Sequence, residues 1–210
     1  MKKTPLLTLL VLLLPFFPLH AQQEEKPEEF AERMQWFSEA KLGIFIHWGI
    51  YAVNGIDESW SFFNGYISHE DYMKQMDGFT AENYDPEHWA ELIRESGARY
   101  AVLTSKHHDG VALWPTGCGH THLDKDYIGP FMKALEEKGL KKGLYFSLLD
   151  WSHPDYPNFT RKINRYEDDS LRWERFREFN FCQIGEILDR YDPDLWWFDG
   201  DAEWWVKGEK

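Results

Sequence analysis

Four short apolar runs, separated by longer amphipathic segments, restrict the fold of this chain more than any other feature. The runs are rich in β-branched and aromatic residues and are bounded by glycine or polar residues, which is typical of strands. They cover residues 42–47, 100–105, 143–149 and 195–198. Because the runs are apolar throughout, both faces of each strand have to be buried. This predicts an α/β fold with a parallel sheet covered by helices.

The segments between the runs predict amphipathic helices. Asp85 can cap the first helix, since Pro86 and apolar residues on one helical face follow it, and Gly97 closes the helix. The expected helices cover residues 86–96, 131–138 and 170–191. Strand–helix–strand units of this kind connect with a right-handed crossover.

The composition excludes one class of partner. The 210 residues include 23 Lys and Arg against 36 Asp and Glu, a formal net charge of −13, whereas nucleic-acid binding depends on clustered positive charge. The chain also has 11 Trp, 10 Tyr and 9 His residues, an unusual excess. Flat aromatic faces suit sugar rings and other ligands with apolar surfaces. We therefore expect no nucleic-acid partner and keep a carbohydrate ligand in view.

Residues 1–21 have the features of a secretory signal peptide. Lys2 and Lys3 precede an uncharged apolar run, and the small residue Ala21 stands before a polar stretch. The run is too short and too often interrupted by proline for a membrane span, and no later stretch is long and apolar enough for one. We expect an exported protein, periplasmic or secreted, with residues 22–35 leading into one domain at residues 36–210.

The two cysteines, Cys118 and Cys182, lie far apart in the sequence. Their number and spacing make neither a disulfide scaffold nor a zinc ribbon. In an oxidising compartment they can form a single bridge, and the sequence leaves that question open.

Two architectures satisfy the alternation of strands and helices, an open doubly wound sheet and a (β/α)8 barrel. A doubly wound sheet that binds a dinucleotide has a glycine-rich turn after its first strand, and Gly43 and Gly49 do not make one. No cofactor is expected. A barrel instead places reactive side chains at the carboxyl ends of successive strands. Such side chains follow all four runs: His47, Lys106, His107, His108, Asp109, Asp150, Asp199 and Asp201.

The barrel interpretation leaves the fold incomplete. A TIM-type barrel has eight strands and about 250 residues, whereas four strands are predicted here. We therefore expect residues 36–210 to form only the first four βα units of a truncated barrel.

Four ordered segments together resemble the α-L-fucosidases of glycoside hydrolase family 29. The segments are residues 40–49, 97–110, 143–147 and 197–200, and they include the strings Lys-His-His-Asp-Gly and Trp-Phe-Asp-Gly. The resemblance spans Trp36 to Trp204 and covers the N-terminal part of that family's catalytic domain. It implies a (β/α)8-like barrel and a retaining hydrolysis of terminal α-L-fucosyl residues through a covalent fucosyl-enzyme intermediate. It also implies fucosylated oligosaccharides or glycoconjugates as partners.

Within this resemblance, Asp199 matches the catalytic nucleophile. Retaining hydrolysis needs a carboxylate at the end of a rigid element, beneath the anomeric carbon, and the end of a strand provides one. Without the resemblance, an Asp-Gly pair after a strand can simply be a turn. Asp201 occupies the next position on the same strand face and is a nearby alternative.

Three histidines match the residues with which that family binds the hydroxyl groups of fucose. A neutral imidazole donates from one nitrogen and accepts at the other, so a group of them can bind a polyol without carrying charge. The histidines are His47, His107 and His108. Pocket walls and further hydroxyl contacts are matched by Trp60, Tyr145 and Trp197, for which core packing is the alternative.

The chain departs from the family pattern in three places, one of which is Lys125-Asp126, where relatives often have Arg-Asp. Many relatives have a glutamate immediately before the tryptophan that matches Trp60, whereas this chain has Ser59 there and Glu58 one residue earlier. In addition, the family's general acid/base carboxylate belongs to the C-terminal half of the catalytic domain, beyond residue 210. We assign that role to no residue here, because Glu203 is too close to Asp199 in sequence.

The connection over residues 50–84 is much longer than an ordinary βα loop and is rich in aromatic residues. Such a loop at the carboxyl ends of the strands is expected to line the mouth of the substrate site. The alternative is that it only covers the outside of the domain.

Two other functions are weighed against the fucosidase hypothesis. The first is a catalytically inactive, fucose-binding fragment. The second is a metal-dependent hydrolase with ligands among His107, His108, His120 and His122. Adjacent residues on a strand face opposite ways, which argues against His107 and His108 binding one ion. We therefore expect no metal.

Overall fold

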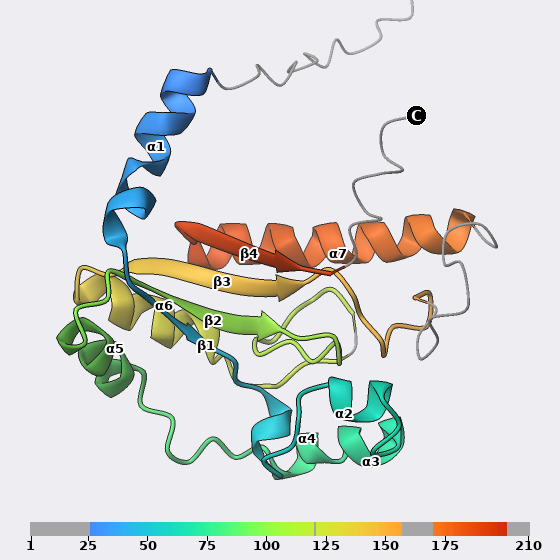
Figure 1. Cartoon of the computed structure of the whole chain (residues 1–210). Helices are drawn as coiled ribbons and strands as arrows, with labels where there is room; N and C mark the ends of the chain where they lie inside the picture. Colours follow the sequence, from blue (N-terminus) through green and yellow to red (C-terminus); the bar gives the residue numbers. More distant parts are fainter. Residues whose placement is uncertain (1–25, 120, 157–169, 201–210) are drawn as a thin grey trace, which may run out of the picture. The chain divides into compact units, whose positions relative to one another are not determined.

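The computed structural model describes residues 26–119, 121–156 and 170–200 (Figure 1). The chain divides into two compact units, Met1–Glu39 and Ala40–Lys210. Helix α1 (Pro27–Ala40) makes up the described part of the first unit and overlaps the expected lead-in. The expected signal peptide, at residues 1–21, lies outside the described residues. No helix in the described ranges is long and apolar enough to cross a membrane.

The second unit is built on a four-stranded sheet. Its strands are β1 (Gly43–Ile46), β2 (Tyr100–Lys106), β3 (Lys141–Ser147) and β4 (Leu195–Asp199). All three strand pairs are parallel, and the order in the sheet is the order in the chain. The α/β fold with a parallel sheet, predicted from the apolar runs, is therefore confirmed.

Three longer helices connect the strands, namely α5 (Pro86–Glu95), α6 (Ile128–Glu137) and α7 (Ser170–Tyr191). The Asp85 side chain caps α5 as predicted, accepting a hydrogen bond from the backbone N–H of His88 at 3.0 Å. The predicted start of α6 at residue 131 is wrong. The Asp126 carboxylate accepts hydrogen bonds from the backbone N–H groups of Ile128 and Gly129, and so caps the helix three residues earlier.

The connection after β1 folds into four short helices: η1 (Ile50–Ala52), α2 (Trp60–Phe63), α3 (His69–Met73) and α4 (Gln75–Gly78). Figure 1 shows them grouped beside the carboxyl ends of β1 and β2. The long connection thus lies at the end of the sheet where we expect the site.

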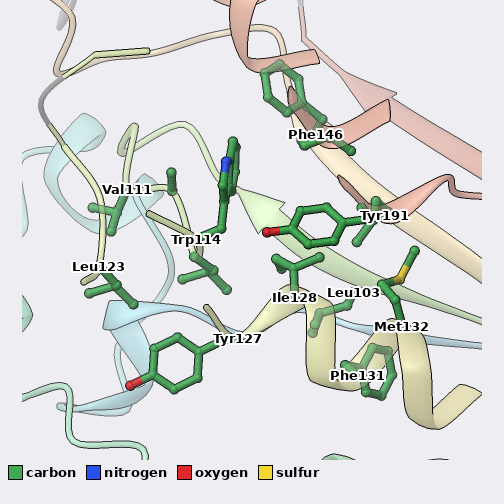
Figure 2. Packing of buried hydrophobic residues seen from close by; sticks show 14 of the residues in the cluster. Leu103, Val111, Trp114, Leu123, Tyr127, Ile128, Phe131, Met132, Phe146 and Tyr191 are labelled. Carbon is green, nitrogen blue, oxygen red and sulfur yellow. The ribbon is translucent and has the colours of Figure 1, made fainter. Parts of the chain in front are cut away.

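One face of the sheet packs against the helices. Leu103 on β2, and Leu144 and Phe146 on β3, are buried on this face. They belong to a hydrophobic cluster with residues of α6 and α7, part of which is shown in Figure 2. The helical members labelled there are Ile128, Phe131, Met132 and Tyr191. Burial of one such side chain stabilises the fold by about 1.5–3 kcal/mol, so this cluster holds the helices to the sheet.

The opposite face carries large aromatic side chains on three strands, Phe45 on β1, Tyr145 on β3 and Trp197 on β4. The ring centroids of Phe45 and Trp197 are 5.2 Å apart, although two strands lie between β1 and β4. Three strand spacings in a flat sheet would separate them by about 14 Å. The sheet is therefore curved, with these rings on its concave side. Phe45 is 38% exposed and Trp197 is 51% exposed.

A disulfide joins Cys118, in the segment after β2, to Cys182 on α7, with a Cα–Cα distance of 6.0 Å. This answers the question that the sequence left open. The same segment is held to α7 by Glu186, whose carboxylate accepts hydrogen bonds from Trp114 Nε1 at 3.1 Å and from the backbone N–H of Gly117 at 2.8 Å.

The carboxyl end of β2 carries a lysine that is fully buried. Lys106 Nζ lies 3.7 Å from Asp150 Oδ2 and donates a hydrogen bond to Asn180 Oδ1 on α7 at 3.1 Å. It also lies 4.4 Å from the centre of the Phe146 ring. Burial lowers the pKa of Lys106 to about 8, against the opposing effect of the Asp150 carboxylate.

A second buried carboxylate, Asp109, directly follows His107 and His108 in the sequence. Asp109 Oδ2 accepts a hydrogen bond from the Tyr72 hydroxyl at 2.6 Å, and Oδ1 accepts one from the backbone N–H of Val111 at 2.9 Å. Burial raises the pKa of Asp109 to about 6. Gly110 has a φ of +79°, and an added Cβ would lie 2.3 Å from the Asp150 carboxylate, so a side chain at this position would displace that carboxylate.

Removal of the disulfide tests how far it stabilises the fold. It closes a loop with a sequence separation of 64, so its loss should lower the free energy of unfolding by about 4 kcal/mol through the entropy of the unfolded chain. We expect urea denaturation of the double variant Cys118→Ser/Cys182→Ser to show this decrease. Reductant should lower the free energy of unfolding of the wild type by the same amount as the two substitutions do, and it should leave that of the double variant unchanged. Equal denaturation midpoints for wild type and variant would contradict the prediction.

The buried Asp109 predicts an unusual dependence of stability on pH. Its pKa of about 6 in the folded chain exceeds its ordinary value of 3.8, so between these values the folded chain binds more protons than the unfolded chain. The free energy of unfolding contributed by Asp109 is therefore present at low pH and is lost as pH rises towards and through 6. A shift of about two units corresponds to roughly 3 kcal/mol.

We expect Asp109→Asn, which keeps a neutral polar side chain, to gain stability relative to wild type by about that amount between pH 4 and pH 7. Urea titrations at one-unit intervals measure the difference. Asp189→Asn on the exposed surface of α7 is the matched control and should show no such change. A pH-independent difference for Asp109→Asn would show that the carboxyl is not protonated in the fold.

Candidate active site

The predicted site residues lie at the carboxyl ends of the four strands. His47 follows β1, His107 and His108 follow β2, and Asp199 is the last residue of β4. Tyr145 lies two residues before the end of β3, and its register partner on β4 is Trp197. Because the strands are parallel and adjacent, these side chains meet at one edge of the sheet.

The carboxylate of Asp199 is held by a tyrosine and remains accessible. Asp199 Oδ2 accepts a hydrogen bond from the Tyr145 hydroxyl at 2.7 Å and lies 3.7 Å from His108 Nε2. The backbone carbonyl of Asp199 accepts a hydrogen bond from the N–H of Leu148 at 2.7 Å, which fixes the strand end. The Asp199 side chain is 45% exposed. The arrangement presents a rigid carboxylate to a ligand.

Tyr145 is the central side chain of the group. Its ring is buried, lies 4.8 Å from the His47 ring and stacks on the His107 ring at 5.6 Å. Burial is the largest cause that raises the pKa of Tyr145 far above its usual value, and the hydrogen bond to Asp199 is the next. The hydroxyl therefore stays protonated and donates to Asp199.

The paired histidines are each bound to a serine. His107 Nδ1 lies 2.6 Å from Ser59 Oγ, and His108 Nδ1 lies 2.5 Å from Ser147 Oγ. Burial lowers the pKa of both imidazoles, and for His107 the neighbouring histidines lower it further. Burial also lowers the pKa of His47, against the opposing charges of Glu58 and Asp199. All three rings are therefore neutral at neutral pH, when they can both donate and accept hydrogen bonds.

The expectation that His107 and His108 face opposite ways is wrong. Their ring centroids are 4.4 Å apart. The pairing of β2 with β3 shifts register between Thr104 and Lys106, and β2 ends at Lys106. The alternation of side chains along a regular strand therefore does not extend to the two histidines.

The two predicted tryptophans lie at the margin of the group. Trp60, on α2, is 38% exposed and contacts the His108 ring edge-on at 5.7 Å. Trp197 shares a strand face with Asp199 and contacts Phe45, as described above. Because both rings are partly exposed, they offer apolar surface to a ligand and are not buried in the core.

Several side chains that sequence reasoning missed complete the site. Phe45 stacks on the His47 ring at 5.0 Å, and Trp151, after β3, lies 4.7 Å from the His108 ring. Ser59 and Ser147 are fully buried beside the two histidines. The sequence signals for two of these side chains were the departure from the family pattern at Ser59 and the position of Trp151 directly after the third strand.

The other strand-end carboxylates that the structure describes are buried. Asp109 and Asp150 are buried with Lys106, as described above. Asp201 and Glu203 lie outside the described residues, as does His120 of the metal hypothesis. Among the residues that the structure describes, no group of three or more His, Cys, Asp or Glu side chains is arranged to hold a metal ion.

Comparisons with known proteins agree on one family. The family model described as alpha-L-fucosidase matches residues 18–209. The alpha-L-fucosidase of Branchiostoma floridae is 32% identical over 194 residues, which covers 80% of this chain and 41% of that protein. The tissue alpha-L-fucosidase of Rattus norvegicus is also 32% identical, with 40% of its length covered. The chain thus spans about two fifths of the curated relatives it matches.

Solved structures give the same result. An alpha-L-fucosidase of family GH29 from Bacteroides thetaiotaomicron matches with a TM-score of 0.70 and 33% identity, covering 80% of this chain and 40% of that one. Alpha-L-fucosidase isoenzyme 1 from Paenibacillus thiaminolyticus matches with a TM-score of 0.74 and 34% identity, covering 85% and 46%. Sequence and fold together show that the chain belongs to the α-L-fucosidases of glycoside hydrolase family 29, whose N-terminal part it matches.

Proposed function

We propose that this chain supplies the nucleophile and the fucose-binding residues of a retaining α-L-fucosidase that acts on terminal α-L-fucosyl residues of oligosaccharides or glycoconjugates. The observation that carries the proposal is the accessible Asp199 carboxylate, fixed by Tyr145 and bordered by neutral histidines. A carboxylate attacks an anomeric carbon from a fixed position, whereas neutral imidazoles bind the surrounding hydroxyl groups.

In the proposed reaction, Asp199 Oδ1 or Oδ2 forms a bond to the anomeric carbon of fucose as the bond to the leaving oxygen breaks. Water then hydrolyses this glycosyl-enzyme intermediate, so the anomeric configuration is retained. The Tyr145 hydroxyl stabilises the carboxylate before attack and after its release. A relative from Bacteroides thetaiotaomicron, 33% identical, is described as a trapped covalent intermediate in complex with 2-fluoro-fucosyl fluoride, which supports this course.

Retaining hydrolysis needs a second carboxyl group about 5–5.5 Å from the nucleophile. Asp109 and Asp150 are unsuited to that role because they are buried with Lys106. The family resemblance implies that the general acid/base belongs to the part of the catalytic domain that this chain does not cover, and we propose the same here. The same observation favours the second candidate function, a segment that binds fucose without cleaving glycosides.

We further propose that the four strands are the first half of a (β/α)8 barrel. The curvature shown by the Phe45–Trp197 contact supports this, because a closed barrel requires a sheet that bends towards one face. The concave face, which carries the predicted site residues, would then be the interior of the barrel.

Export through a signal peptide at residues 1–21 is also proposed. The disulfide between Cys118 and Cys182 supports it, since such bonds persist in oxidising compartments and are rare in the cytosol.

Binding of free L-fucose tests the histidine assignment. We expect His47→Ala to weaken binding by about tenfold, because a hydrogen-bond partner of a sugar hydroxyl is lost. Isothermal titration calorimetry or an NMR titration measures the affinity. His88→Ala, on the exposed side of α5, is the control and should bind as wild type. Dialysis against EDTA should also leave binding unchanged. Loss of binding after EDTA would instead favour the metal-dependent alternative.

Covalent labelling tests the nucleophile independently of the general acid. In 2-fluoro-fucosyl fluoride the leaving group is fluoride, which departs without being protonated by a carboxyl group. The 210-residue chain should therefore gain one fluorofucosyl group, located by peptide mass spectrometry on Asp199. Asp199→Asn should remain unlabelled, whereas the surface control Asp189→Asn should be labelled.

With a chromogenic α-L-fucoside, by contrast, we expect no turnover by this segment, since acid catalysis contributes about 10² to 10⁴-fold. Robust cleavage by the segment would contradict our assignment of the acid/base elsewhere. Labelling of a residue other than Asp199 would contradict the proposed nucleophile.

A further inference from the structure

His108 lies between a buried serine and the carboxylate of Asp199. Its Nδ1 is 2.5 Å from Ser147 Oγ, and its Nε2 is 3.7 Å from Asp199 Oδ2. Ser147 is fully buried at the end of β3, where it is the register partner of Asp199 on β4. The hydrogen bonds around Ser147 determine which nitrogen of the neutral His108 ring carries the proton.

Ser147 Oγ takes part in three short polar contacts and has one proton to donate. Oγ lies 2.7 Å from the backbone carbonyl oxygen of Leu149, a group that only accepts, so the hydroxyl proton is directed there. The backbone N–H of Leu149 donates to Oγ at 3.1 Å. The remaining contact, with His108 Nδ1, therefore needs a proton from the imidazole.

A neutral imidazole carries one proton, so a proton on Nδ1 leaves a lone pair on Nε2. Burial lowers the pKa of His108 and so keeps the ring neutral. Its Nε2 lone pair then faces Asp199 Oδ2. This oxygen also acts only as an acceptor, and it already accepts a hydrogen bond from the Tyr145 hydroxyl. Two acceptors separated by 3.7 Å do not bond to each other. A hydroxyl group placed beside them can donate to Nε2.

We propose that Ser147 is a positioning residue that fixes His108 in the tautomer with its proton on Nδ1, so that His108 acts as a hydrogen-bond acceptor for a hydroxyl of the sugar bound over Asp199. The role of His108 towards sugar rests on the proposed function, whereas the proton on Nδ1 follows from the contacts of Ser147 and the lone pair on Nε2 from the neutral ring. With this tautomer, His108 also selects between sugars. A sugar that lacks a hydroxyl at that position leaves the buried Nε2 of His108 without a donor.

The test is nitrogen-15 NMR of the full chain labelled on histidine, at neutral pH, with the His108 signals assigned from a His108→Ala variant. Protonated and lone-pair ring nitrogens have widely separated chemical shifts. We expect Nδ1 of His108 to be protonated in the wild type, and Ser147→Ala to show a new population with the proton on Nε2. Ser105→Ala is the matched control, because Ser105 is an equally buried serine whose hydroxyl donates to the carbonyl of Tyr145 at 2.6 Å. It should leave the His108 tautomer unchanged.

A wild-type His108 with its proton on Nε2 overturns the proposal, and this measurement does not require the Ser147 variant to fold. An unchanged tautomer in a folded Ser147→Ala overturns the positioning role. Addition of L-fucose separates the two proposals: we expect it to shift the Nε2 resonance of His108. If no histidine of the site responds to fucose, the proposed function fails while the tautomer result stands.

Discussion

The parallel register between β3 and β4 is the constraint on which the site depends. It pairs Tyr145 with Trp197 and Ser147 with Asp199. Because paired residues of adjacent parallel strands point to the same side, Tyr145 and Ser147 both lie on the face that carries Asp199. A shift of one residue would turn these side chains towards the helices and separate the tyrosine hydroxyl from the carboxylate. The apolar cluster beneath the sheet opposes such a shift, since the shift would also expose Leu144 and Phe146.

Beneath the two histidines lies a layer of buried charge. Lys106, which immediately precedes them, is held by Asp150 and by Asn180 on α7, and Asp109, which follows them, is held by Tyr72 on α3. A buried charge without a partner is strongly destabilising, so the chain on either side of His107 and His108 is fixed by polar contacts to other elements. The disulfide strengthens this arrangement because it ties α7 to the segment that follows β2. Rigid support of this kind suits a site whose histidines must hold particular orientations.

The sequence predicted the strands, two of the three long helices and the side chains at the strand ends. Buried parallel strands are apolar throughout, and this pattern is visible without a structure. The start of α6 was misplaced because its capping carboxylate, Asp126, comes before Tyr127 rather than directly before the helix. The short helices between β1 and α5 escaped prediction because helices of four or five residues depend on tertiary packing rather than on local preference.

The site itself was predictable only in part. The resemblance named Asp199 and the histidines, but it could not show that Tyr145 is hydrogen-bonded to the carboxylate. The contacts of Ser59 with His107 and of Ser147 with His108 join residues 48 and 39 positions apart, so no local pattern indicates them. The convergence of His107 and His108 depends on the irregular end of β2, which period-two alternation misrepresents.

The concave aromatic face combines exposed apolar surface with the accessible carboxylate of Asp199. Phe45 and Trp197 remain partly in water, and they lie on the same side of the sheet as the accessible oxygen atoms of Asp199. Any polypeptide that shields these rings therefore also covers the approach to the Asp199 carboxylate. The apolar area exposed to water on this face and the access of a ligand to Asp199 would consequently decrease together.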